Sequence, residues 1–315
     1  MKYRTYISFF IVLFTTACTK EVIVDIPEAE EKLVVDGRIE TNEPPVVLLT
    51  KSNNIYDETT GNLLLESIVS GATVTVSDGS NTVELDEICS QSLPQGSEEA
   101  IASFLNIDVE ELEAINICFY STTDPSIYGQ VGKTYQLEIE YEGEVYNSST
   151  EILQPVPPDS IYWREDPDSP DNGYSWVVLS DPPGQFDAYF WECRRINIEG
   201  GQPIDDRFLT TFNPAFDDAF FDGLSFEFAY ENPHNMNPDT PAEDRGYYQR
   251  GDSVAVKFSK IDKDVYEFME MKYVQLQTGG SPFATPSNLP SNISNDALGV
   301  WAGYSTYFDT LYCDD

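Results

Sequence analysis

Residues 166–173, DPDSPDNG, gather four oxygen-bearing side chains and raise the question of metal binding: Asp166, Asp168, Asp171 and Asn172. Carboxylate and amide oxygens are the ligands that Ca²⁺ prefers in proteins. The spacing departs from that of the EF-hand loop, however, and the two prolines limit how the carboxylates can converge. We therefore expect a solvated turn here, with no metal and no other cofactor, and calcium binding is the alternative.

Catalysis by a nucleophile needs a positioned base, and the chain offers a single histidine, His234. Its neighbours, Asn-Pro-His-Asn at 232–235, have none of the context of a nucleophile elbow. We expect this histidine to be exposed to solvent and inert. The 55 acidic residues form so many accidental pairs that no catalytic carboxylate pair stands out. The sequence therefore predicts a protein that is not an enzyme and has no catalytic residues.

The stretch FNPAFDDAFFDGLSFEFAY, residues 212–230, is dense in phenylalanine. Exposed aromatic rings can stack on sugars or contact a partner protein, whereas buried rings fill a core. We expect core packing here, and a binding surface is the alternative.

The N-terminus has the anatomy of an export signal. Lys2 and Arg4 give a positive start, residues 7–14 form an apolar run, and small residues follow. This run is far shorter than the ~20 residues that cross a bilayer as a helix. The cysteine that ends it, Cys18, resembles the acylation site of a bacterial lipoprotein, which implies removal of residues 1–17 and lipid attachment to Cys18. The alternative is an ordinary cleaved signal with a free thiol at that position.

Residues 18–31 read as an acidic tether between the cysteine and the first strand. Lys20 followed by acidic residues resembles the surface-export signal of Bacteroidota lipoproteins. That resemblance implies a lipid-anchored protein on the cell-surface side of the outer membrane. A plain soluble spacer is the alternative.

An exported chain with an even number of further cysteines is expected to form disulfides. Four remain besides Cys18, and they allow three pairings: Cys89, Cys118, Cys193 and Cys313. The pairing that respects the domain division below is Cys89–Cys118 with Cys193–Cys313. There is no CxxC motif, so the cysteines give poor support for a metal site.

The amino-acid composition limits the classes of partner that the protein can bind. A formal charge of −38, from 55 acidic and 17 basic side chains, repels nucleic acid and anionic headgroups. This charge is compatible with three interpretations: solubility alone, cation binding, or a basic protein partner. The 41% of hydrophobic residues can build a core, which argues against disorder. Removal of the signal leaves 298 residues (315 − 17), a length that suits two domains.

The first half reads as antiparallel β-structure. Apolar and polar residues alternate at 72–85 around Asp78-Gly79 and at 134–152 around Glu142-Gly143, which predicts two hairpins. Residues 32–39 and 45–51 read as further strands. No long helix separates these segments, so we expect an N-terminal β-sandwich over residues 32–153.

A helical insertion interrupts this predicted sandwich at about residues 97–116. Its apolar residues recur at helical spacing, and Asp108 with Glu111 matches a capping box. Cys89 and Cys118 bracket the insertion, so a disulfide between them would fix its base.

A proline-rich stretch at 154–158 reads as a linker, because proline removes backbone donors and ends sheet pairing. Beyond it, strands are predicted at 174–180, 188–198 and 252–259, followed by one helix capped by Ser259. The expected fold class is therefore mainly β. It consists of two tandem antiparallel β-sandwich domains, Ig- or fibronectin-like, with the second spanning residues 159–315.

Several segments together resemble the DUF4249 lipoproteins of Bacteroidota: KLVVDGRIETNEPPVVLLTKS, VSGATVTVSDGSNTVEL, GQVGKTYQLEIEYEGEVYNSST, PVPPDSIYW and NISNDALGVWAGYST. They occur in order over nearly the whole chain after the signal. The resemblance implies a two-domain β-sandwich protein of the outer membrane, encoded in many cases beside TonB-dependent (SusC-like) β-barrels that import nutrients. The family has no established catalytic residues to carry over.

We therefore expect a non-enzymatic outer-membrane lipoprotein that acts as a ligand-binding or accessory subunit of a TonB-dependent transporter, with an unknown ligand. The alternative is a structural subunit of an outer-membrane assembly that binds no small molecule. A concave aromatic pocket would favour the first hypothesis, and a large flat apolar patch would favour the second.

Overall fold

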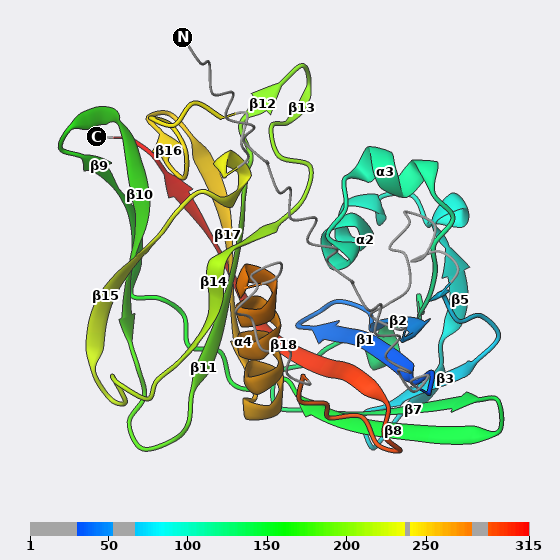
Figure 1. Ribbon diagram of the computed structural model, residues 1–315. Coiled ribbons are helices and arrows are strands. Elements are labelled where there is room, and N and C mark those ends of the chain that lie inside the picture. The colour runs from blue at the N-terminus through cyan, green and yellow to red at the C-terminus, as the bar shows by residue number, and fades with distance from the viewer. Residues whose placement is uncertain (1–29, 53–66, 237–239, 279–288, 315) are drawn as a thin grey trace, which may run out of the picture. The chain divides into compact units, whose positions relative to one another are not determined.

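The computed structural model describes residues 30–52, 67–236, 240–278 and 289–314 (Figure 1). The expected signal peptide, Cys18 and nearly all of the acidic tether lie outside these residues. Within the described ranges, every helix is too short or too polar to cross a membrane.

An eight-stranded sheet runs through the molecule. In spatial order its strands are β14 (Leu209–Asp217), β11 (Ala188–Arg195), β17 (Ser253–Ile261), β18 (Leu298–Tyr312), β1 (Leu33–Glu40), β2 (Val46–Lys51), β6 (Cys118–Ser121) and β5 (Asp86–Cys89). The pair β1 and β18 is parallel, whereas the other neighbours are antiparallel.

The parallel pair joins the two halves that the sequence predicts as separate sandwiches. It begins with Val34 opposite Leu298 and ends with Glu40 opposite Tyr304. Residues Glu31–Asp315 accordingly form one compact unit. The prediction of a mainly β fold with antiparallel sheets is confirmed, but two independent tandem sandwiches are not, since both halves contribute strands to one sheet. The domain boundary at 154–158, an irregular segment between β8 and β9, stays a prediction.

Two smaller sheets pack against one face of the eight-stranded sheet. The first has the order β4 (Thr82–Glu84), β3 (Thr73–Ser77), β7 (Thr134–Tyr141) and β8 (Glu144–Glu151). The second has β15 (Ser225–Tyr230), β10 (Ser169–Ser180) and β16 (Tyr248–Gln249), with β9 (Ser160–Asp166) paired to β10. A separate two-stranded ribbon is formed by β12 (Ile198–Glu199) and β13 (Gln202–Pro203). Both predicted hairpins, β3–β4 and β7–β8, are confirmed.

Each small sheet closes its own apolar core. The first core contains Trp301, whose ring lies so close to Gly37 that a Cβ there would approach it to 2.7 Å. Glycine is therefore required at position 37. The second core is built around Trp191 and Phe258. Burial of these large side chains is the main stabilising contribution on this face of the sheet.

The helices lie on the opposite face of the sheet (Figure 1). Among the described residues they are α2 (Glu98–Leu105), α3 (Val109–Ala114) and α4 (Lys263–Thr278). The described ranges also contain the 3₁₀ turns η1 (Ser90–Ser92), η2 (Pro125–Ile127) and η3 (Pro233–Asn235), of which η2 packs Ile127 into the first core. Helix α4 packs Val265 and Phe268 over β17 and β18, and the α2–α3 insertion packs Ile101 and Leu112 over β6. The predicted insertion is confirmed.

The helix caps differ from those predicted. Asp108 makes no capping hydrogen bond to α3, because its carboxylate pairs with Arg207 instead. Helix α4 begins after Asp262, whose Oδ1 accepts a hydrogen bond of 2.9 Å from the Val265 amide. Ser259, the predicted cap, lies within β17.

The disulfide Cys89–Cys118 is confirmed, with the two residues directly opposite each other on β5 and β6. The predicted Cys193–Cys313 disulfide is wrong, because both are free and buried. Cys193 lies on β11 and Cys313 directly follows β18, with β17 between these two strands. At least two inter-strand spacings, about 10 Å, therefore separate them. A disulfide needs Cα atoms within about 7 Å.

Candidate functional site

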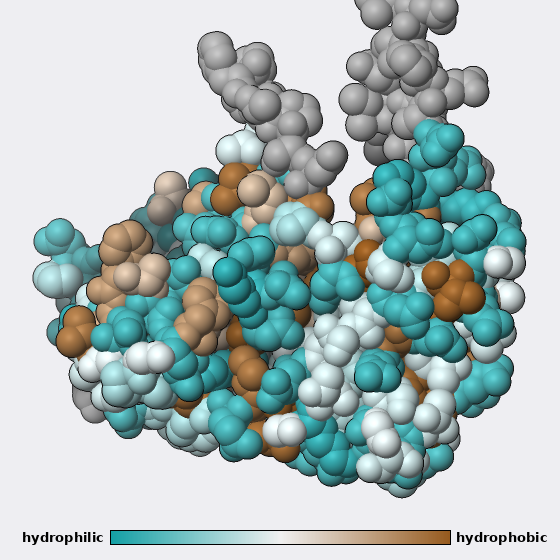
Figure 2. Space-filling view, turned by 90° about the horizontal axis from the view of Figure 1, so that it is seen from below, coloured by the Kyte–Doolittle hydropathy of each residue, from teal (hydrophilic) through white to brown (hydrophobic). Residues whose placement is uncertain are grey.

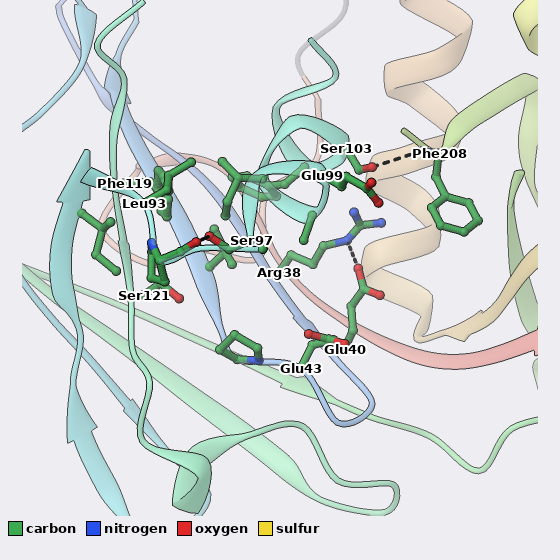
Figure 3. A pocket seen from close by; sticks show the side chains of 18 of the residues that line it. Arg38, Glu40, Glu43, Leu93, Ser97, Glu99, Ser103, Phe119, Ser121 and Phe208 are labelled. Carbon is green, nitrogen blue, oxygen red and sulfur yellow. Dashed lines mark hydrogen bonds and ion pairs between the residues drawn. The ribbon is translucent and has the colours of Figure 1, made fainter. Parts of the chain in front are cut away.

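A cavity of about 450 Å³ lies between α2 and the helix-bearing face of the eight-stranded sheet (Figure 3). Its apolar walls come from the insertion and the residue after η1, from β2, β5, β6 and β18, and from the segment around Phe208: Val46, Ile88, Leu93, Ile101, Phe104, Phe119, Phe208 and Phe308. Charged side chains are gathered on the sheet side and at the rim: Arg38, Glu40, Glu43, Glu99, Arg194 and Lys257.

Strand alternation explains how charged residues reach the cavity. On β1, Val35 and Ile39 belong to the core beneath the sheet. Successive side chains of a strand point to opposite faces, so Arg38 and Glu40 emerge on the helix-bearing face. The same alternation on β17 buries Phe258 below and presents Lys257 above.

Four charges form a closed network on this face, named here the charge quartet: Arg38, Glu40, Glu192 and Lys257. Arg38 Nε lies 2.8 Å from Glu40 Oε1, and its Nη2 lies 3.1 Å from Glu192 Oε2. Lys257 Nζ lies 2.8 Å from Glu40 Oε2 and 3.2 Å from Glu192 Oε2. None of the four side chains is more than 14% exposed. The formal charges of the quartet cancel.

The quartet spans β18, whose side chains on the same face of the sheet contact it. The Arg38 guanidinium lies 4.4 Å from the centre of the Tyr304 ring, a cation–π contact. The Thr306 hydroxyl donates a hydrogen bond of 3.5 Å to Glu40. The Tyr304 ring and the Thr306 hydroxyl therefore help to hold the charges in one geometry.

Mutual pairing keeps these groups ionised. Burial alone would raise the pKa of Glu40, but the nearby charges of Arg38 and Lys257 outweigh it, and the pKa lies below its usual value. Burial opposes the charge of Arg38 as well, yet Glu192 and Glu40 raise its pKa well above the usual value. A buried ion needs such compensation, because taking an isolated charge out of water is costly.

A second set of polar contacts connects the insertion to β11 and to the segment around Phe208, and is named here the latch. Arg194 Nη1 lies 2.8 Å from Glu99 Oε2, and the Phe208 amide donates a hydrogen bond of 3.1 Å to Ser103 Oγ. The third contact of the latch is the ion pair between Arg207 and Asp108. The latch closes one side of the cavity with polar contacts, whereas the other side is held by the apolar cluster beneath α2 and α3.

A smaller cavity of about 140 Å³ lies on the far side of the latch, between α2 and α4. Arg38, Ser103, Phe104 and Phe208 line both cavities. These shared residues form the partition between the two spaces.

The expected turn covers only part of residues 166–173: Asp166 ends β9, Pro167 and Asp168 form the turn, and β10 begins at Ser169. Asp166 accepts hydrogen bonds from the Asp168 amide, at 2.8 Å, and from the Tyr247 hydroxyl, at 3.0 Å. The Asp171 side chain is 93% exposed, whereas Asn172 is buried and donates to the Glu243 carbonyl. Asp166 and Asn172 are thus engaged by protein groups and Asp171 extends into solvent, so these three predicted ligands are not brought together.

Sequence reasoning missed a different acidic group, Asp181, Asp218 and Asp222, whose oxygens lie within 4.8 Å of one another. Such a group could hold a cation, but protein donors engage each carboxylate. Asp181 accepts from the Tyr189 hydroxyl at 2.6 Å, and Asp222 accepts from the Gly184 amide at 2.6 Å. Asp218 accepts from the Asp187 amide at 3.0 Å, and burial raises its pKa.

His234 is not exposed as predicted: its side chain is 10% accessible. Nε2 lies 3.2 Å from the Cys193 carbonyl and Nδ1 lies 3.4 Å from Asp205, which also forms an ion pair with Arg195. Burial lowers the pKa of His234. Both ring nitrogens contact structural partners, so the ring fixes its loop to β11.

The phenylalanine-rich stretch packs largely as predicted. Phe216, Phe226 and Phe228 contact the second core, and Phe220 at a loop tip is 95% exposed. On the face seen in Figure 2, apolar side chains are interspersed with hydrophilic ones and form no large continuous patch.

The four members of the quartet were not identified as site residues from the sequence. A signal was present, because Lys257 interrupts the apolar run VAVKFS and Glu192 interrupts AYFWEC. A charge inside a strand that is otherwise apolar indicates a paired buried ion.

A family model described as a domain of unknown function, DUF4249, matches residues 19–307. No curated protein matches the chain at a significant level.

Proposed function

Because the chain belongs to the DUF4249 family, whose description assigns no activity, we propose from the geometry that it is a non-enzymatic binding protein that holds a small molecule in the cavity beneath α2. The observation that carries this conclusion is the cavity itself, about 450 Å³, with apolar walls and a fixed polar floor. Small-molecule sites have this character, and their volumes lie at roughly 300–1,000 Å³.

Binding fits the cavity better than catalysis does. Within the described ranges, its lining residues include no histidine and no cysteine. The carboxylate of Glu40 is committed to Arg38 and Lys257, so it cannot readily act as a base. The Ser121 hydroxyl is also committed, since it donates a hydrogen bond of 2.8 Å to the Pro45 carbonyl. An activated nucleophile would need a neighbouring free base.

Filling the cavity tests this function. Ala100 is exposed on α2 and lines the cavity, so Ala100→Trp should occupy the space without disturbing the core. Ala114 is exposed on α3 and does not line it, so Ala114→Trp is the matched control. In a thermal-shift screen of small molecules, compounds that stabilise the wild type and Ala114→Trp should not stabilise Ala100→Trp. A library whose hits stabilise all three proteins alike would contradict binding at this cavity.

Under this proposal the mature chain is anchored by acylated Cys18 on the outer membrane, at its cell-surface side. The support is the sequence pattern of residues 1–18 and the acidic tether. Metabolic labelling with a radioactive fatty acid should mark the wild type and not Cys18→Ser, which should leave the membrane fraction. Equal labelling of both chains would exclude acylation at this position.

The partner in this proposal is a TonB-dependent, SusC-like outer-membrane barrel, to which the protein is a ligand-binding accessory. The support is the family resemblance together with the net charge of −38, which suits association with protein or a neutral ligand and disfavours nucleic acid. Affinity purification from detergent-solubilised outer membranes should recover a barrel. Recovery of other envelope proteins and no barrel would favour the structural-subunit alternative.

A further inference from the structure

We infer that the ligand is an uncharged amphipathic small molecule, with one apolar or aromatic face and one hydroxyl-bearing face. This inference rests on the proposed binding function and names the chemical class that fits its cavity.

The balance of charge is the first argument. The quartet is neutral, and the Arg194–Glu99 ion pair at the rim is neutral as well. Each of the three cations that line the cavity is therefore already paired, and the chain as a whole carries −38. An anionic ligand that took Arg38 or Lys257 from the quartet would leave a buried carboxylate uncompensated. At Arg194 it would have to compete with Glu99, a carboxylate already in place.

The cavity does not favour a cationic ligand either. Glu40 and Glu99 are occupied by Lys257 and Arg194. Glu43 is the remaining carboxylate of the lining, and it is exposed at the mouth, where water screens it. A single screened carboxylate gives a cation a small gain against the cost of removing that cation from water.

The distribution of polarity is the second argument. Ile101, Phe104 and Phe119 present apolar surface to the cavity, and Arg38, Glu40 and Lys257 of the quartet present charged groups. Figure 3 shows Phe119 apart from Arg38 and Glu40. Charged donors and acceptors form strong hydrogen bonds with neutral hydroxyls and need no change in their own pairing. A molecule with one ring against the aromatic wall and several hydroxyls toward the sheet therefore satisfies both surfaces.

The volume sets the size of such a ligand. The cavity volume of about 450 Å³ is that of roughly 15 molecules of liquid water, at ~30 Å³ each. A monosaccharide carrying one phenyl ring is of this order, so phenyl β-D-glucopyranoside is a suitable probe.

The test compares three probes that differ in one substituent. They are phenyl β-D-glucopyranoside, the glucuronide with a carboxylate at C6, and the 6-amino-6-deoxy glucoside with an ammonium at C6. Isothermal titration at pH 7 should show the uncharged glucoside binding at least tenfold more tightly than either charged analogue. Ala100→Trp should lose this binding, and Ala114→Trp should keep it.

Tighter binding of the glucuronide or of the amino sugar would overturn the inference. If no glycoside binds but the uncharged apolar probe 1-naphthol binds the wild type and not Ala100→Trp, the hydroxyl-bearing face is refuted while the binding function stands. If neither the glycosides nor 1-naphthol binds, the proposed function itself fails.

Discussion

Lys257 Nζ lies 2.8 Å from Glu40 Oε2, although the two residues are 217 positions apart in the chain. Lys257 lies on β17 and Glu40 on β1, and β18 runs between them. The contact exists because β18 pairs in parallel with the first strand and so brings both halves of the chain into one sheet. The floor of the cavity is therefore assembled from both halves.

Breaking the quartet should destabilise the fold. Lys257→Met removes one of two cations and leaves Glu40 and Glu192 buried with Arg38 alone, which should cost about 3–5 kcal/mol of unfolding free energy. Urea denaturation measures this loss of unfolding free energy. The double variant Lys257→Met/Glu40→Gln restores the charge balance and should recover part of the loss. A single variant within 1 kcal/mol of wild type would contradict the burial of these charges.

The quartet should also make stability depend on acid. The pKa of Glu40 is lower in the folded protein than the unfolded value of about 4.3. The folded state therefore releases this proton more readily, and the stabilisation is fully present above pH ~4.3 and lost as pH falls through the lower folded value. Urea midpoints between pH 3 and pH 7 should fall less steeply toward acid for Glu40→Gln than for wild type. Parallel curves would contradict the assigned shift.

Asp218 should affect the pH dependence of stability in the opposite direction to Glu40. Burial raises its folded pKa above the unfolded value of about 3.9, so its contribution to stability is present below that value and lost as pH rises through the folded pKa. Asp218→Asn keeps an oxygen for the Asp187 amide and removes the titration. The variant should gain stability relative to wild type at pH 7 and lose that advantage near pH 3. A difference that does not change with pH would argue against a raised pKa.

The disulfide should hold the insertion in place. Cys89–Cys118 closes a sequence separation of 29 residues, for which loop entropy predicts about 3–4 kcal/mol. After reduction, amide hydrogen exchange should quicken in α2 and α3 and stay unchanged in α4, which packs on a different part of the sheet. Uniform acceleration across all three helices would show that the effect is global.

The latch should govern ligand exchange. Arg207→Ala removes an ion pair with exposed Asp108, a contact worth about 0.3–1 kcal/mol. The variant should release a bound ligand roughly 2–5-fold faster, with little change in thermal stability. Arg164→Ala removes an exposed pair with Glu227 on the second small sheet and is the matched control. Equal dissociation rates for both variants would exclude a role for the latch in exchange.

Local features of this fold could be predicted from the sequence. The hairpins at Asp78-Gly79 and Glu142-Gly143 depend on alternation and turn chemistry within a few residues. The bonded cysteines bracket a segment whose helical spacing was visible, and the phenylalanines of residues 212–230 pack mainly in a core.

The features that could not be predicted depend on distant parts of the chain. The sequence around Val34 and Leu298 does not indicate that these residues pair, so the sheet shared by both halves of the chain was not predicted. The expectation of a Cys193–Cys313 bond relied on an even count of cysteines, whereas β17 keeps the two apart. The candidate site was missed for the same reason, since Arg38 and Glu192 meet through that shared sheet.

Photolabelling tests the location of the bound molecule most directly. 4-Azidophenyl β-D-glucopyranoside carries a reactive group on the ring that should lie against Phe104, and peptide mapping locates the covalent adduct. The account predicts adducts within residues 93–104 or at Phe208 in the wild type and in Ala114→Trp, and their loss in Ala100→Trp. Adducts elsewhere on the chain, or labelling of Ala100→Trp equal to that of wild type, would contradict it.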